Sequence, residues 1–389
     1  MAPRPIYLDH NATCPLEPAA RRAMLRLWDQ DSCFGNPASA HRFGRRARRE
    51  LEDFREGMGR LLGVKIGSPG AGRLIFTSSG TEANNLALFG LAGQQPARVV
   101  VSPIEHPSVS AAAAELARRG WAVQHARVDR DGRIDLEHLR SLLQQPTRLV
   151  SLMLGNHETG VLQPVSEAAS LCRAAGAALH TDLVQVAGKR GIDFDQIGAA
   201  AAAVSAHKFG GPVGIGCLLL RHDTVLEPIL FGGQQQYALR PGTEPVASAA
   251  GMSAALEVWR RDGDARSERL ADLRDRLETN LRSGYAGLVV HGDQVERLPH
   301  VSCVAFPGLD RQALLMALDL AGVACSAGSA CASGSSEPSP VLLAMGVPDE
   351  LVQASIRLSL GPSTTEQDVD EAAARILQTA NDLRRGSVR

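Results

Sequence analysis

The stretch AAAAAVSAHKFGGPVGIGCLLL, residues 199–220, consists of two apolar runs joined by a short polar turn. Apolar runs of this length, bounded by polar and glycine residues, are typical of strands buried in a parallel sheet. The first run ends at Ser205, and His207 and Lys208 follow it closely. Ligands of such sheets bind at the carboxyl ends of the strands, so this lysine stands where a functional group is expected.

Similar runs on both sides of this stretch alternate with helical patterns. The predicted strands cover residues 73–79, 97–103, 121–128, 148–154, 177–182, 201–206 and 214–221. The predicted helices between them cover residues 81–93, 107–120, 135–145 and 165–176. This alternation predicts an α/β fold in which helices cover both faces of a mainly parallel sheet.

A long helical pattern over residues 246–284 leads to a second alternation of strands and helices. Single hydrophobic cores stop growing near roughly 250–300 residues, so a chain of 389 residues suits two domains. We predict a large domain of residues 16–262 and a smaller α/β domain of residues 1–15 and 263–389. The smaller domain contains a Gly/Ser-rich segment, residues 325–340, with two cysteines, Cys325 and Cys331.

Composition argues against several classes of protein. The chain is 44% hydrophobic and 21% charged, as globular proteins are, which argues against disorder and coiled coil. A net charge of −1 and an aromatic share of 4% argue against nucleic-acid and membrane-surface binding. No apolar run approaches the roughly 18 residues of a membrane span, so we expect a soluble, cytoplasmic protein. The seven cysteines lack C-x-x-C spacing, so we expect neither a disulfide framework nor a metal site.

Polar groups follow five of the predicted strands, at residues 78–82, 105–106, 156–158, 180–185 and 205–208. The first group lies in FTSSGTEANN, a pattern of strand, turn and helix N-terminus. Backbone N–H groups at the start of a helix point to one spot, so this pattern predicts an anion site. Neither common glycine motif for nucleotides occurs. An anion site, the Asp182 carboxylate and the Lys208 amine together suggest pyridoxal phosphate, which forms a Schiff base with lysine and needs an anion beside its ring nitrogen.

A series of motifs occurs in order between about residues 6 and 370: LDHNAT, FGNPASAH, FTSSGTEANN, IEHPSV, HTDLVQVAGK, VSAHKFGGPVGIG, RPGTEP, GSACASGSSEPS and SIRLSLG. Together they resemble the cysteine desulfurases of the NifS/IscS type, fold-type I pyridoxal-phosphate enzymes of the class V aminotransferase family. The resemblance implies a homodimeric enzyme that takes sulfur from L-cysteine and leaves L-alanine. The sulfur would be held as a cysteine persulfide and passed to an acceptor, such as an iron–sulfur scaffold protein or the machinery that thiolates RNA.

The resemblance also implies roles for residues at the matching positions. Lys208 would bind the cofactor covalently, Asp182 would pair with its ring nitrogen, and Cys331 would attack the substrate sulfur. A Gly/Ser-rich segment suits such a nucleophile, which must be exposed and ionised. Arg357 and Asn11 would bind the substrate, the arginine by clamping its carboxylate. The other cofactor contacts would come from Gly80, Thr81, His106 (which would also move protons), His157, Gln185, Ser205, His207 and, from the second subunit, Thr243.

The sequence departs from the family pattern at several positions. His157 stands where asparagine is usual, and a histidine can change its charge near neutral pH. His10 also replaces a common asparagine, and Gln234 and Gln236 replace a glycine and an acid. Cys325 stands where serine is frequent, and it could relay sulfur, form a disulfide or pack as a small apolar residue.

Three alternatives to a desulfurase remain open at this stage. A selenocysteine lyase and a cystine or cysteine C–S lyase have the same fold, and the departures at His157 and His10 are compatible with either activity. A cofactor-binding relative without catalysis, serving as a scaffold in sulfur transfer, is the third. The presence of Lys208, Asp182 and Cys331 together argues against this last reading, because a scaffold would not need all three.

Overall fold

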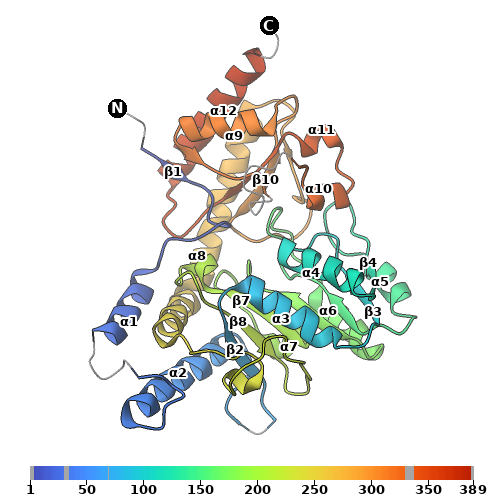
Figure 1. Ribbon diagram of the computed structural model, residues 1–389. Helices are drawn as coiled ribbons and strands as arrows, with labels where there is room; N and C mark the ends of the chain where they lie inside the picture. The colour runs from blue at the N-terminus through green and yellow to red at the C-terminus, as the bar shows by residue number, and fades with distance from the viewer. Residues whose placement is uncertain (1–3, 30–34, 69, 329–336, 387–389) are drawn as a thin grey trace.

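The apolar stretch of residues 199–220 forms two strands of a seven-stranded sheet whose order is β2-β8-β7-β6-β5-β3-β4 (Figure 1). β8 is antiparallel to both of its neighbours, and all other neighbouring strands are parallel. The predicted mainly parallel sheet is thereby confirmed. The strands are β2 (Arg73–Thr77), β3 (Arg98–Val101), β4 (Ala122–His125), β5 (Leu149–Ser151), β6 (Ala178–Asp182), β7 (Ala201–Ser205) and β8 (Gly216–Leu220).

The computed structural model describes residues 4–29, 35–68, 70–328 and 337–386. Within these residues, no helix has an apolar stretch long enough to cross a membrane.

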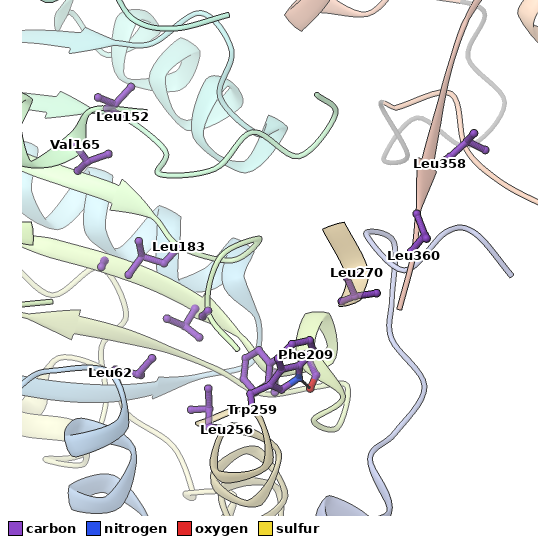
Figure 2. Close-up of a cluster of buried hydrophobic side chains, with 14 of the residues drawn as sticks. Leu62, Leu152, Val165, Leu183, Phe209, Leu256, Trp259, Leu270, Leu358 and Leu360 are labelled. Atoms are coloured by element: carbon purple, nitrogen blue, oxygen red, sulfur yellow. Dashed lines mark hydrogen bonds between the residues drawn. The ribbon is translucent and has the colours of Figure 1, made fainter. Parts of the chain in front are cut away.

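Helices cover both faces of the large sheet, and strand β7 shows why its sequence is apolar throughout. Ala201 and Ala203 pack into a cluster with α3 and α4, whereas Ala202 and Val204 belong to the cluster on the opposite face. Successive side chains of a strand point to opposite faces, so a strand covered on both sides is apolar at every position. Figure 2 shows part of the cluster that contains Ala202 and Val204, including Phe209. The helices are α3 (Gly80–Ala92), α4 (Pro107–Arg118), α5 (Leu136–Leu142), α6 (Val165–Ala174) and α7 (Phe194–Ile197).

The long helix predicted after Pro245 is α8 (Val246–Gly284), which is continuous over 39 residues. It packs on α1 (Pro18–Trp28) and α2 (Arg42–Leu61) near its start and on α12 (Glu366–Gly386) toward its end. In Figure 1 it runs from the large sheet to the C-terminal part of the chain. The predicted domain boundary at residues 262–263 therefore falls inside one helix, and the division into domains stays a prediction.

A small antiparallel sheet, in the order β12-β10-β9, forms the core of the C-terminal part. Beside it, β1 (Ile6–Tyr7) pairs in parallel with β11 (Val323–Ala324), which brings the N-terminal segment to this end of the molecule. The remaining elements are β9 (Val289–Val290), β10 (Val301–Ala305), α9 (Arg311–Leu320), α10 (Pro340–Ala344), α11 (Asp349–Val352) and β12 (Ser355–Ser359).

Candidate active site

A cavity of about 280 Å³ opens at the carboxyl ends of the strands, where the sequence predicts a site. Most of the predicted cofactor residues line it: Gly80, Thr81, His106, His157, Asp182, Gln185, Ser205, His207 and Lys208. A second cavity of about 360 Å³ lies between α8 and the segment after β6, and it includes none of these residues. Position alone therefore points to the smaller cavity as the functional one.

The turn between β2 and α3 forms one end of the cavity. The Ser79 side chain caps α3 by accepting a hydrogen bond from the Glu82 backbone N–H at 3.2 Å. A Cβ added to Gly80 would lie 2.8 Å from Val184 Cγ2 and 3.3 Å from Ser205 Cβ, so only glycine allows β7 to approach this closely. The start of a 13-residue helix therefore faces the cavity, and helix N-termini attract anions.

Lys208 lies in a short 3-10 turn, η1 (Ala206–Phe209), directly after β7. Its Nζ donates to the backbone oxygens of Asn11 at 2.6 Å and Ala12 at 2.9 Å. The turn ends at Gly210, which has a φ of +86°, a conformation that favours glycine. The amine is thus held at the cavity by the N-terminal segment, which is distant in sequence.

The neighbouring His207 lies on the same turn and also lines the cavity. Burial, together with the charges of Lys208 and Lys189, lowers the pKa of His207 to about 4. Its ring is therefore neutral near pH 7, and its Nδ1 lies 3.2 Å from Thr13 Oγ1.

Asp182 ends β6 and lines the cavity from the sheet side. Its Oδ2 accepts a hydrogen bond from Asn84 Nδ2 at 2.7 Å, and its Oδ1 accepts one from the Val184 backbone N–H at 2.8 Å. Asn84 also donates to Ser108 Oγ at 2.8 Å. The sequence analysis missed Asn84 and Ser108, although Asn84 lies three residues after Thr81 and hence on the same helix face.

Two histidine rings meet in the wall of the cavity. The His106 and His157 ring centroids lie 5.4 Å apart, with an edge-to-face angle of 74°. His106 caps α4, its Nδ1 accepting from the Ser108 backbone N–H at 3.1 Å, and burial lowers its pKa. Burial also lowers the pKa of His157 well below its usual value, with His106, Arg357 and Lys208 adding to the effect. His157 Nδ1 has no hydrogen-bond partner among the described residues.

The Glu105 carboxyl, part of the polar group at residues 105–106, is buried, and the sequence analysis assigned it no role. Its Oε1 accepts a hydrogen bond from the Met153 backbone N–H at 2.6 Å, and its Oε2 has no partner among the described residues. Burial and, to a lesser degree, the negative charge of Asp182 raise its pKa to about 8. Glu105 is therefore mainly protonated near pH 7.

The predicted substrate residues lie beside the cavity and converge on the backbone oxygen of His157. Arg357, on β12 and 2% exposed, donates to this oxygen at 3.0 Å, and Asn11 Nδ2 donates to it at 3.1 Å. Arg357 also forms an ion pair of 2.7 Å with Asp9. The Nη1 and Nη2 of Arg357 are therefore already paired, whereas its Nε has no hydrogen-bond partner among the described residues.

A second buried lysine near the cavity was not predicted. Lys189 Nζ donates to Gln185 Oε1 at 3.0 Å, while Gln185 Nε2 donates to the Asn11 backbone oxygen at 3.2 Å. Burial, together with the charges of Lys208 and Arg357, lowers the pKa of Lys189 to about 7. Close to Lys208, this amine is therefore only partly charged at neutral pH.

The structure does not test two of the predicted roles. Thr243 is exposed and outside the cavity of its own chain, and Cys331 lies outside the described residues, so both roles stay predictions. Cys325 is described, and burial raises the pKa of its thiol to about 12, which disfavours it as a nucleophile. In the described part of the chain, no group of three or more His, Cys, Asp or Glu side chains could hold a metal ion.

Some departures from the family pattern have a structural explanation. Gln236 is buried, its Oε1 accepts from Arg55 at 2.8 Å and its Nε2 donates to Glu244 at 2.7 Å, so an amide at this position pairs with a cation and with an acid at once. Gln234 is exposed. Burial lowers the pKa of His10 to about 4, so this histidine adds no charge near pH 7.

The residues of the cavity fit pyridoxal phosphate. A helix N-terminus faces the end that would receive a phosphate, and the Lys208 amine and the Asp182 carboxylate lie on the same cavity. The unpartnered polar atoms of its wall, His157 Nδ1 and Asn84 Oδ1, remain available to a ligand. The chemistry of this set of groups suits the cofactor suggested by the sequence.

Comparison with known proteins decides the family. The model of the aminotransferase class-V family matches residues 6–372. This chain belongs to that family. Dependence on pyridoxal phosphate is a general property of the family, so the predicted cofactor is confirmed.

The relatives include cysteine desulfurases. Cysteine desulfurase IscS of Dictyoglomus turgidum is 37% identical, over 94% of this chain and 92% of its own. Cysteine desulfurase NifS of Azotobacter vinelandii is 37% identical, over 97% of this chain and 93% of its own. A solved NifS-like protein from Rickettsia africae is 32% identical, covers 97% of this chain and 100% of its own, and has a TM-score of 0.86. The predicted fold and NifS/IscS type are confirmed.

Proposed function

We propose that this protein is a cysteine desulfurase that converts L-cysteine to L-alanine and leaves the sulfur as a persulfide on Cys331. The observation that carries the proposal is that the Lys208 amine, the Asp182 carboxylate and the α3 N-terminus converge on one cavity. The step balances, because the substrate C–S bond breaks and an S–S bond forms: L-cysteine and the enzyme thiol become L-alanine and the enzyme persulfide.

The chain would bind and orient the cofactor from three directions. Lys208 would hold it covalently, and Asp182 would pair with its ring nitrogen, oriented for this by Asn84. Gly80, with the α3 N-terminus, would receive the phosphate. When bound, pyridoxal phosphate supplies an electron sink that weakens bonds to the substrate α- and β-carbons.

The neutral histidines and the arginine would serve the substrate end. His106, whose pKa is lowered by burial, would accept and return protons, because a ring that is neutral near pH 7 can gain a proton and release it again. Arg357 would bind the substrate carboxylate through its planar donors, a geometry that suits a carboxylate. Cys331 would attack the substrate sulfur, since Cys325 has a strongly raised pKa.

The lysine assignment can be tested with little ambiguity, because the chain has only three lysines: Lys65, Lys189 and Lys208. Borohydride reduction of the purified holoenzyme fixes the cofactor to its lysine, and peptide mass spectrometry identifies the residue. We expect the label on Lys208. Lys208→Ala should lack the yellow absorbance band, whereas the exposed Lys65→Ala should keep it. A label on Lys189 would refute the assignment.

The reaction is tested with L-cysteine, L-selenocysteine and L-cystine supplied in parallel. Alanine and a Cys331 persulfide from L-cysteine are the expected products, and Cys331→Ser should keep the cofactor band but lose both. Alanine from selenocysteine alone, or pyruvate from cystine, would instead make the protein a lyase. In that case His157→Asn is the first variant to examine, because His157 is the departure that lines the cavity.

We further propose a cytoplasmic homodimer that passes its sulfur to an acceptor protein such as an iron–sulfur scaffold. The exposed segment that contains Thr243 also exposes Phe231, which is 85% accessible, and this supports a contact with a second copy of the chain. Sedimentation of the purified protein tests the dimer. A fully active monomer would overturn it.

A further inference from the structure

The Glu158 carboxyl contacts both described flanks of the segment that contains Cys331. Its Oε2 accepts a hydrogen bond from Ser339 Oγ at 2.6 Å. The same oxygen would lie 2.7 Å from a Cβ added to Gly328, so the carboxyl packs directly on that glycine. Gly328 precedes Cys331 in the chain and Ser339 follows it. One buried carboxyl, 1% exposed, therefore joins the two sides of this segment.

The same carboxyl lies beside the residues that border the cavity. Its Oε1 is 3.6 Å from His157 Nε2 and has no hydrogen-bond partner among the described residues. Arg357 donates to the backbone oxygens of His157, at 3.0 Å, and Gly328, at 2.9 Å. Glu158, His157 and Arg357 thus form one buried cluster that touches the cavity and the start of the Cys331 segment.

The surroundings of Glu158 make its charge sensitive to pH. Burial raises its pKa to about 7, although the Ser339 hydrogen bond and the charges of Arg357, on β12, and Arg311, on α9, oppose this rise. Two further titratable groups face it: His157, and Cys303 on β10, whose pKa Glu158 helps to raise. The carboxyl therefore changes between neutral and charged near neutral pH.

We propose that Glu158 is a positioning residue for sulfur transfer: it holds residues 326–328 and 337–339 together, so that the segment containing Cys331 starts and ends beside Arg357 and His157. This rests on the proposed function. The hold is stronger in the charged form, because a hydrogen bond to an ionised acceptor is roughly twice as strong as a neutral one. Sulfur transfer is accordingly faster when Glu158 is ionised.

The first test measures persulfide formation on Cys331 from L-cysteine in the holoenzyme and its variants. We expect Glu158→Ala to lower the rate at least tenfold while the cofactor absorbance band is unchanged. Glu337→Gln is the matched control on the same flank, because its side chain is exposed, and it should keep the wild-type rate. A Glu158→Ala rate equal to that of the wild type would overturn the proposal.

The second test uses Glu158→Gln, which keeps the size of the side chain and an acceptor for Ser339 but cannot ionise. In the wild type, the rate of persulfide formation should increase as the pH rises through about 7. In Glu158→Gln this increase should be absent, and the rate should stay at the value that the wild type has at low pH. If Glu158 acted only in folding, Glu158→Gln would not remove this pH dependence of the rate. If the increase remains in Glu158→Gln, Glu158 is not the titrating group and the proposal is wrong.

A third measurement separates this proposal from the proposed function. The rate at which iodoacetamide alkylates Cys331, followed by peptide mass spectrometry without substrate, reports how the segment is held. It should rise at least threefold in Glu158→Ala and stay unchanged in Glu337→Gln. Absence of persulfide in the wild type would refute the desulfurase, whereas equal alkylation in wild type and Glu158→Ala would refute the positioning role.

Discussion

Replacing Glu105 with glutamine should change how the stability of the protein depends on pH. Burial and the Asp182 charge raise the pKa of Glu105 from an ordinary 4.5 to about 8. Between these two values the folded protein holds a proton that the unfolded chain releases. The contribution of Glu105 to the free energy of unfolding is therefore complete below pH 4.5 and is lost as the pH rises toward 8.

The magnitude follows from the shift. Each pH unit inside this window costs the wild type about 1.4 kcal/mol of stability, so the loss between pH 5 and pH 7 is roughly 3 kcal/mol. Glutamine does not titrate, and its oxygen can still accept the Met153 N–H. The stability of Glu105→Gln minus that of the wild type should therefore increase by roughly 3 kcal/mol from pH 5 to pH 7. Any constant cost of burying the amide cancels in this comparison.

Urea unfolding of the holoenzyme at pH 5, 6, 7 and 8, followed by circular dichroism, measures this difference. Titrating groups that do not interact with Glu105 contribute equally to both proteins and cancel. Glu268→Gln, at an exposed position of α8, is the control for the effect of a Glu-to-Gln exchange by itself. If the Glu105→Gln difference is constant across this range, Glu105 is ionised in the folded protein and the reasoning is refuted. Cofactor binding at pH 7 should be unaffected, since the wild-type side chain is already neutral there.

Two further substitutions test the site and its support. Gly80→Ala places a Cβ 2.8 Å from a Val184 methyl group, so it should weaken cofactor binding. In an absorbance titration, we expect the dissociation constant of the cofactor to rise about tenfold, a loss of about 1.4 kcal/mol. Gly191→Ala is the control and should leave cofactor binding unchanged, because its added Cβ meets open space. Gln236→Glu replaces the donor to Glu244 with a second carboxylate and should lower the free energy of unfolding by about 1–3 kcal/mol near pH 7, as measured by thermal unfolding. The control is Gln234→Glu at an exposed position, and a loss of stability as large as that of Gln236→Glu would contradict this explanation.

Much of the fold and of the site could be predicted from local patterns. The apolar runs and their helical separators identify the strands of the large sheet, because the periods of strands and helices depend only on neighbouring residues. Lys208 and Asp182 could be placed together because each follows a strand, and the ends of parallel strands meet at one edge of a sheet. The antiparallel pairing of the small sheet had no comparable local signal.

The residues to which the sequence analysis assigned no role owe their roles to neighbours far along the chain. Asn84 bonds to Asp182, which is 98 residues away, and Glu158 bonds to Ser339, which is 181 residues away. No short motif announces such pairs. Glu105 stands in the sequence as an ordinary acid, and only its burial makes it neutral near pH 7.

The sequence by itself therefore determined the strands of the large sheet, the helices α3 to α6 between them, the long helix α8 and the chemical types of the groups at the strand ends. The tertiary structure alone decided which of these groups are buried, what each one bonds to and which of them are charged. The physical reason is that secondary structure follows from local propensity and periodicity, whereas desolvation and hydrogen bonding depend on the whole packed chain. For this protein that difference separates Lys208, which could be found from its motif, from Glu158, whose partners appear only when the chain is folded.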